Sequence, residues 1–255
     1  MLIGAAAGAS AGLFGIGGGI IVVPALVVTF ATLQFTPDHL THIAVGTSLA
    51  TIVVTGSASA WMHHRHRAVR WPLVRGLLPG IVIGAVIGAL FADTLSSERL
   101  RQLFGVLQIV LAAKMLFNLM PQRGEFTPRR GEMPLVGGVI GAVASCFGIG
   151  GGALTGPYLI WRGQAVHDAV GTAAAVGVPI ALAGAVSFII TGLNASQLPA
   201  WSSGYIYWPA FAAISAATLV FAPLGARLAH RLNAKVLKKA FAVLLVIIGI
   251  KMLSG

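Results

Sequence analysis

The segment FGIGGG occurs twice in this chain, at residues 14–19 and 147–152, and each copy is followed at the same distance by a proline, Pro24 or Pro157. Glycine clusters let the backbone leave helical geometry and expose N–H groups that a helix would otherwise pair. Such groups, with the positive end of the following half-helix, form an anion site. We therefore expect one small anion to bind between two sets of glycines: Gly15, Gly17, Gly18 and Gly19 from the first copy, and Gly148, Gly150, Gly151 and Gly152 from the second.

Hydroxyl side chains stand close to both clusters in sequence. Thr47 and Thr172 occupy matched positions of two similar stretches, and Ser48 and Thr155 lie near them. Hydroxyls donate to anion oxygens without the cost of a buried charge, so we expect these four residues to line the site. Ser and Thr in apolar helices also bond back to their own backbone, and glycine clusters also serve close helix packing, so both alternatives stay open.

Two histidines share the same symmetry. His42 and His167 each precede the matched threonine by five residues. A histidine there can titrate near neutral pH and couple proton movement to the anion, or it can simply bond a helix end at the membrane interface. Asp38, Asp93 and Asp168 all lie near the ends of apolar blocks, so no carboxylate stands inside one as a proton carrier.

Other patterns point to no cofactor, metal or catalysis. The run 63–66 (HHRH) has no carboxylate or cysteine nearby, and we interpret it as an interfacial cluster. Residues 148–153 formally fit a dinucleotide fingerprint but follow no soluble strand. The single cysteine, Cys146, is expected to act as a small apolar residue. No Ser/His/Asp, HExxH or CxxC arrangement indicates an enzyme.

The elements that position these residues are apolar helices. Hydrophobic residues make up 57% of the 255-residue chain and charged residues 9%, and the mean hydropathy is +0.90, which indicates an integral membrane protein. Continuous apolar runs predict an all-α fold rather than a barrel. Basic residues cluster in short loops, so the net charge of +11 reflects topology and not nucleic-acid binding. The predicted blocks are 2–28, 43–62, 77–92, 100–120, 135–161, 169–191, 205–228 and 236–253.

The chain is predicted to consist of two homologous four-segment halves, 1–120 and 135–255, joined by a cytoplasmic linker at 121–134. The loop 63–75 is rich in arginine, whereas its counterpart 192–204 carries no charge; the loop 228–240 is basic, whereas its counterpart 93–101 is balanced. Basic loops face the cytoplasm, which favours inverted halves. Inversion requires an odd number of crossings per half, so the glycine-broken block that starts each half is expected to re-enter. Eight full spans in a parallel repeat are the alternative.

The sequence resembles the TauE/SafE family, also called the sulfite exporter family, of membrane anion permeases. The resemblance rests on residues 12–19 (GLFGIGGG) with Pro24, on the second copy ending at Pro157, and on 44–48 (AVGTS). It implies a multi-pass protein of the bacterial inner membrane that moves sulfite, a sulfonate or a related organosulfur anion. We expect a secondary transporter with alternating access, with protons as a possible coupling ion and with the lipid bilayer and a homo-oligomer as partners; an uncoupled anion channel is the alternative. Ala173 stands where Ser48 has its counterpart, so the halves differ in binding.

Overall fold

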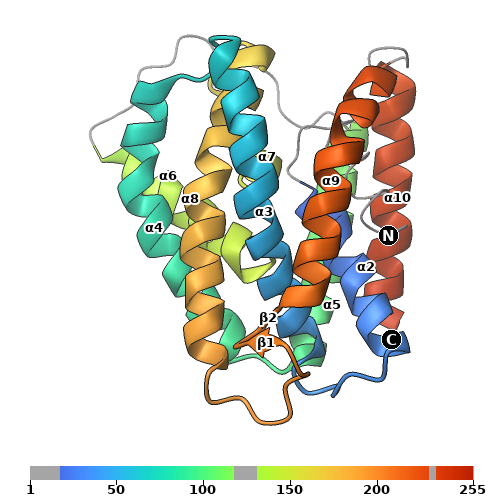
Figure 1. Ribbon diagram of the computed structural model, residues 1–255. Helices are drawn as coiled ribbons and strands as arrows, with labels where there is room; N and C mark the ends of the chain where they lie inside the picture. The colour runs from blue at the N-terminus through green and yellow to red at the C-terminus, as the bar shows by residue number, and fades with distance from the viewer. Residues whose placement is uncertain (1–17, 118–130, 230–233, 255) are drawn as a thin grey trace.

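The computed structural model describes residues 18–117, 131–229 and 234–254, and almost all of this part is helical (Figure 1). A short antiparallel hairpin pairs Ser202 with Tyr207 and Ser203 with Ile206. The elements in chain order are α2 (Gly19–Thr32), α3 (Leu40–Arg65), α4 (Trp71–Asp93), α5 (Ser97–Phe117), α6 (Glu132–Cys146), α7 (Gly152–Trp161), α8 (Val166–Gly192), β1 (Ser202–Ser203), β2 (Ile206–Tyr207), α9 (Trp208–Ala229) and α10 (Ala234–Ser254).

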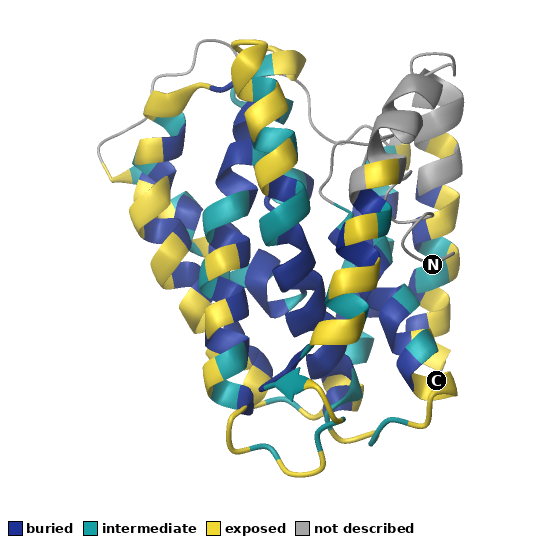
Figure 2. Ribbon diagram, viewed as in Figure 1, coloured by how far each residue is buried: buried dark blue, intermediate teal, exposed yellow. Residues whose placement is uncertain are grey.

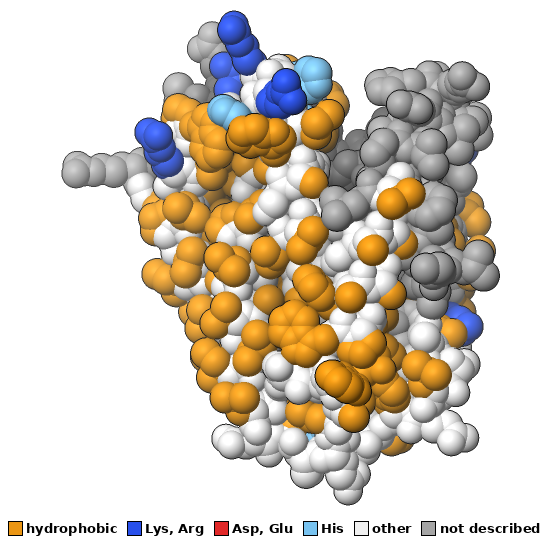
Figure 3. Space-filling view, in the orientation of Figure 1, with side chains coloured by type: hydrophobic (Ala, Val, Ile, Leu, Met, Phe, Trp, Pro, Cys, Tyr) orange, Lys and Arg blue, Asp and Glu red, His pale blue; other side chains and the backbone are white. Residues whose placement is uncertain are grey.

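The helices have the length and surface of a membrane protein. In the described part, α3, α4 and α8 are long and apolar enough to cross a bilayer. At about 1.5 Å per residue, the 26 residues of α3 extend beyond a hydrocarbon core of about 30 Å. Large apolar side chains such as Ile83, Val139 and Ile190 are exposed on the flanks. Figure 3 shows hydrophobic side chains over the side of the bundle, with Lys, Arg and His at its upper end. The prediction of an all-α membrane protein is confirmed.

The core lies along α3 and α8, which pack side by side and run in opposite directions (Figure 1). Buried residues line both helices where they face the bundle, while the outer face of α4 is exposed (Figure 2). Equivalent helices of the two halves also run oppositely: α4 descends and α9 ascends in Figure 1, and α5 ascends and α10 descends.

The fifth predicted block is divided in two. α6 ends at Cys146 and α7 begins at Gly152, so the second glycine cluster separates them. Glu132 at the start of α6 accepts a hydrogen bond of 3.2 Å from the Tyr158 hydroxyl and pairs at 3.1 Å with Arg162, just after α7. These contacts join the outer ends of the two helices, which therefore form a hairpin.

Predicted boundaries differ from the structure by a few residues at most helices, and two of the differences have a clear physical reason. α6 begins at Glu132, inside the stretch predicted as linker, because this carboxylate favours a helix N-terminus and has partners on α7. α9 begins at Trp208, three residues after the start of the predicted block at 205, because Ile206 and Tyr207 pair as a strand. The first half of the first predicted block and most of the linker lie outside the described residues.

Small residues bring α4 and α6 into backbone contact. Gly80, Gly84 and Gly88 recur every four residues along α4. A Cβ on any of them would overlap the carbonyl of Pro134, Gly138 or Ala142 on α6. Here glycine serves the packing role that small residues have throughout membrane bundles.

Candidate functional site

The two glycine clusters meet at the start of α2. A Cβ added to Gly19 would lie 2.5 Å from the carbonyl oxygen of Gly148 and 3.0 Å from the Cα of Ile149. Only glycine fits between these backbones. Residues 129 positions apart in sequence, Gly19 and Gly148, thus form one contact, which positions the first turn of α2 against the break between α6 and α7.

This contact lies near the middle of the long helices. The same position on Gly19 is 2.9 Å from the side chain of Ile52, which stands halfway along α3. A Cβ on Gly151 would be 3.0 Å from Gly177 and from Ile180, both near the middle of α8. The glycine breaks are therefore at mid-depth of the bundle, where irregular backbone is tolerated only if it is enclosed by protein or lines a cavity.

Two glycines of the clusters adopt a conformation that other residues avoid. Gly18, which precedes α2, has φ +73°, and Gly148, which follows α6, has φ +65°. Gly151, the counterpart of Gly18, has φ −55° and is right-handed. The breaks are therefore not identical in conformation. Gly15 and Gly17 lie outside the described residues.

The break in the second half leaves amide groups available. The N–H groups of Gly148 and Ile149 donate back to Ser145 and Ala144 on α6, at 3.2 and 2.9 Å. Those of Gly150, Gly151 and Gly152 have no backbone partner among the described residues. They precede or open α7, so the positive end of that half-helix adds to their attraction for an anion.

Most predicted hydroxyls are engaged elsewhere. The Ser48 hydroxyl donates to the Gly148 carbonyl at 2.8 Å and so ties α3 to the break. Thr47 accepts a bond of 3.0 Å from the Tyr207 N–H, and Thr172 accepts one of 3.0 Å from the Arg70 N–H. Because α3 and α8 run oppositely, the two threonines lie on opposite sides of mid-depth, roughly 20 Å apart along the bundle from the rise per residue. The structure does not bring them together.

Three buried polar atoms beside the breaks have no hydrogen-bond partner among the residues that the structure describes: Thr155 Oγ1, Ser145 Oγ and Gln108 Oε1. Thr155, predicted from the sequence, stands in the first turn of α7, and Ser145 in the last turn of α6. Gln108 on α5 donates through Nε2 to the Ile20 carbonyl at 2.8 Å, which fixes Oε1 as an acceptor. Buried polar groups are normally paired, so these atoms are suited to hold a polar ligand.

Sequence reasoning missed Gln108 and Ser145. The repeat places the apolar Leu245 and the small Gly12 at their counterpart positions, so symmetry gave no reason to select them. An uncharged polar residue inside an otherwise apolar block was the available signal for Gln108. For Ser145 the signal was its place just before the glycine cluster.

Comparison with known proteins identifies the family of this chain. Residues 1–252 match the family described as sulfite exporter TauE/SafE. The chain belongs to this family. A probable membrane transporter protein of Haemophilus influenzae is 38% identical over 253 residues, which cover 99% of this chain and 96% of that protein.

More distant TauE/SafE relatives carry similar names. A probable membrane transporter protein of Methanocaldococcus jannaschii is 27% identical, with 96% of this chain and 89% of that protein covered. The probable membrane transporter protein YunE of Bacillus subtilis is 24% identical, with 99% and 96% covered. No solved structure matches the chain significantly. The protein is thus a multi-pass membrane transporter by family.

The two matched histidines of this TauE/SafE protein have different surroundings. His42 is 2% exposed, and its Nε2 lies 3.0 Å from the Ala92 carbonyl, which can only accept, so Nε2 carries a proton. Its Nδ1 is buried and has no hydrogen-bond partner within the described part of the chain. His167 has a 65% exposed side chain, with Nδ1 3.8 Å from Asp168. Only His42 is enclosed by the fold.

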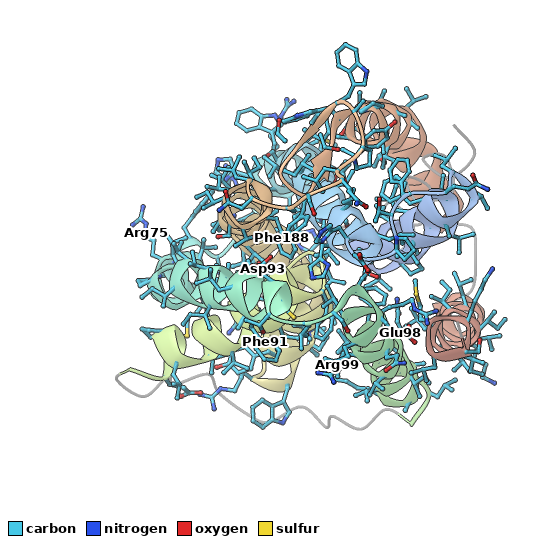
Figure 4. All side chains as sticks on the ribbon, turned by 90° about the horizontal axis from the view of Figure 1, so that it is seen from below. Arg75, Phe91, Asp93, Glu98, Arg99 and Phe188 are labelled. Atoms are coloured by element: carbon cyan, nitrogen blue, oxygen red, sulfur yellow. The ribbon has the colours of Figure 1, made fainter. Side chains whose placement is uncertain are left out.

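Titratable groups surround His42 at the lower end of the bundle. The ring of Tyr205, in the β1–β2 hairpin, lies 5.1 Å from the His42 ring, and that of His39 lies 6.3 Å away. Burial and the carboxylate of Asp93, a hydrogen-bond partner of the phenol, raise the pKa of Tyr205 to about 12. Figure 4 shows Asp93 at the end of α4 towards the middle of the bundle, with Arg75 from the other end of α4 at the rim.

Proposed function

We propose that this protein is a secondary transporter that binds a small anion between its two glycine breaks. The anion class is sulfite, a sulfonate or a related organosulfur compound, and the membrane is the bacterial inner membrane. The direct contact between Gly19 and Gly148 at mid-depth carries the proposal. Family membership supports transport, and sulfite is named in the family description.

The proposed ligands are the open amides of Gly150, Gly151 and Gly152 with the hydroxyls of Ser145 and Thr155. Hydroxyls and amides donate to anion oxygens without bringing a second charge into the membrane. Thr47 and Thr172 take a different role, as contacts between the halves.

An inverted repeat is proposed for the topology. Its support is the opposite direction of α3 and α8, of α4 and α9, and of α5 and α10 (Figure 1). In the same view the arginine-rich connection between α3 and α4, the end of α9 and the start of α10 lie at the upper end, which the positive-inside rule assigns to the cytoplasm. The α6–α7 hairpin then re-enters from the cytoplasmic side. Rocking of one half against the other alternates access to the breaks.

Flux of labelled sulfite in proteoliposomes tests the site. Ser145→Ala and Thr155→Val are expected to raise KM, because each removes a donor worth about 1–3 kcal/mol to a charged ligand, or roughly five- to a hundredfold. Ser57→Ala is the control, since that exposed hydroxyl bonds its own helix at Val53. Unchanged kinetics in both site variants would refute the ligand assignment. Flux that does not saturate as the sulfite concentration rises would indicate a channel instead of a transporter.

We also propose that protons are the coupling ion and that His42 Nδ1 accepts them. This atom is buried and unpartnered, whereas His167 is exposed. The charged and titratable groups around it are Asp93, Tyr205 and His39. A pH gradient is expected to drive flux in wild type and in His167→Gln but not in His42→Gln. A His42→Gln variant that still follows the gradient would exclude this residue.

A further inference from the structure

A groove runs beside α2 on the surface of the bundle. Its volume is about 600 Å³, and it lies between α2, the start of α5 and the end of α10. Ile21, Pro24 and Val28 form its α2 wall, and Ile248 and Met252 form its α10 wall. These walls offer almost nothing to a polar ion, but they match a hydrocarbon chain.

Two cations stand at one end of this groove. Arg101 is near the start of α5 and Lys251 is in the last turn of α10, and both line the groove. Glu98 is the acidic neighbour: its Oε1 lies 3.4 Å from the Arg101 guanidinium and also accepts a bond from Gln102. Its side chain is 67% exposed, and it lies on the α10 side of α5 in Figure 4. Two positive charges against one shared carboxylate leave this end of the groove positive.

The depth of the cations and of the apolar walls fits one membrane leaflet. α5 and α10 run in opposite directions, so the first turns of α5 and the last turn of α10 share the lower end of the bundle (Figure 1). Arg101 and Lys251 each lie about one turn from a helix end, at interface level. The groove starts near mid-depth, because Ile21 follows the mid-depth contact of Gly19. It extends along α2, whose 14 residues span about 20 Å. Half a hydrocarbon core is about 15 Å thick, so the groove is long enough to cross one leaflet.

We propose that this groove binds an anionic glycerophospholipid of the leaflet at the lower end of the bundle. The phosphate lies between Arg101 and Lys251, and one acyl chain lies along α2 towards mid-depth. Basic pockets between membrane helices bind anionic lipid head groups on the cytoplasmic side, and Arg101 and Lys251 offer the same charge pairing at the opposite end of the bundle. The site is separate from the glycine breaks and does not depend on the proposed substrate. Because α2 carries Gly19, a lipid here also supports the helix whose first turn meets the second break.

Lipid binding to the purified full-length protein tests the proposal, with native mass spectrometry to measure Kd and thermal unfolding as a second readout. Phosphatidylglycerol is expected to bind and to raise Tm, since a ligand of the folded state stabilises it. Arg101→Gln/Lys251→Gln is expected to bind about thirtyfold more weakly, from roughly fivefold per cation near the membrane surface.

A charge-matched control is available on the same helix. Arg99→Gln/Lys114→Gln removes two positive charges from α5, one of them at the repeat counterpart of Lys251, and neither residue lines the groove. It is expected to bind as wild type does. If both double variants bind phosphatidylglycerol equally weakly, the loss comes from overall charge, and the proposed site is overturned.

Three further measurements distinguish an anionic lipid in the groove from other occupants. Val28→Trp keeps both cations but fills the groove, and it is expected to lose phosphatidylglycerol binding; wild-type binding would show that no acyl chain lies there. Glycerol phosphate, the headgroup without chains, is expected to leave Tm unchanged. A shift equal to that of the lipid would identify a free-anion site instead. Equal affinity for phosphatidylcholine would also overturn the proposal, because that headgroup has no net charge.

Discussion

The Thr47–Tyr207 contact and the Thr172–Arg70 contact are the same backbone arrangement at opposite ends of the bundle. In each, a threonine accepts an N–H from the segment before a helix of the other half, at 3.0 Å. The glycine before each threonine lies equally close to the backbone of the other segment. A Cβ added to Gly46 would lie 2.5 Å from the carbonyl oxygen of Tyr205, and one added to Gly171 would lie 2.5 Å from that of Ala68. The two matched stretches of sequence thus share one backbone geometry.

The side chains around these contacts differ. The lower one includes buried His42, Tyr205 and nearby Asp93, whereas the upper one has an ion pair of 2.6 Å between Arg70, 58% exposed, and Asp168. The same backbone arrangement thus carries different chemistry at the two ends of the bundle.

Gly46→Ala and Gly171→Ala test the shared backbone and should give the largest effects. The new methyl would overlap a carbonyl of the other half, and overpacking of this kind costs about 1–3 kcal/mol. Both variants are expected to lower Tm and to abolish sulfite flux. Gly56→Ala is the control on α3, because a Cβ there meets its nearest neighbour at an ordinary 3.5 Å. A stable, active Gly46→Ala protein would contradict the close approach.

Thr47→Val and Thr172→Val remove only the hydroxyl acceptors. Each leaves a partly buried N–H unpaired, at a cost of about 1–3 kcal/mol. The two changes are expected to lower the free energy of unfolding by similar amounts. A loss confined to one of them would show that the two contacts are equivalent in geometry but not in energy.

The pKa of Tyr205 tests how the side chains at the lower contact differ from those at the upper one. It is about 12, compared with 10.0 for a free tyrosine. A raised folded-state pKa means that the folded protein holds this proton more tightly. Its contribution to stability is therefore complete below about pH 10 and declines as pH rises towards 12. Tyr205→Phe should remove that decline, which Tm measured between pH 9 and 12 would detect. The tyrosinate absorbance of Tyr205→Phe subtracted from that of wild type gives the pKa directly, and a value near 10 would contradict the buried setting.

The upper ion pair should have the smallest effect. Asp168→Asn is expected to cost less than about 1 kcal/mol, because water and salt screen the exposed Arg70. Raising ionic strength should reduce even this difference between variant and wild-type Tm. A loss as large as that of Thr172→Val would mean that Asp168 supports more than Arg70.

Composition and periodicity were enough to predict the helices and the approximate blocks, since continuous apolar runs of this length have few other structures in a membrane. The doubled glycine cluster also indicated where helices break. Partners far apart in sequence were not predictable: nothing local indicates that Thr47 pairs with Tyr207, or that Gln108 turns its amide to Ile20.

The matched histidines show the same limit. His42 and His167 have equivalent positions in the repeat, and only the neighbours decide their burial. Tyr205 covers His42, whereas the counterpart of Tyr205 is the small Ala68. The ring that covers His42 therefore comes from a residue more than a hundred positions away in sequence.

The most extensive helix contacts, α4 with α6, α3 with α8 and α5 with α10, all join one half of the chain to the other. The glycines of α4 have their close partners on a helix that is synthesised later. Neither half alone covers these surfaces, so the bundle is complete only after the second half has been synthesised and has packed against the first.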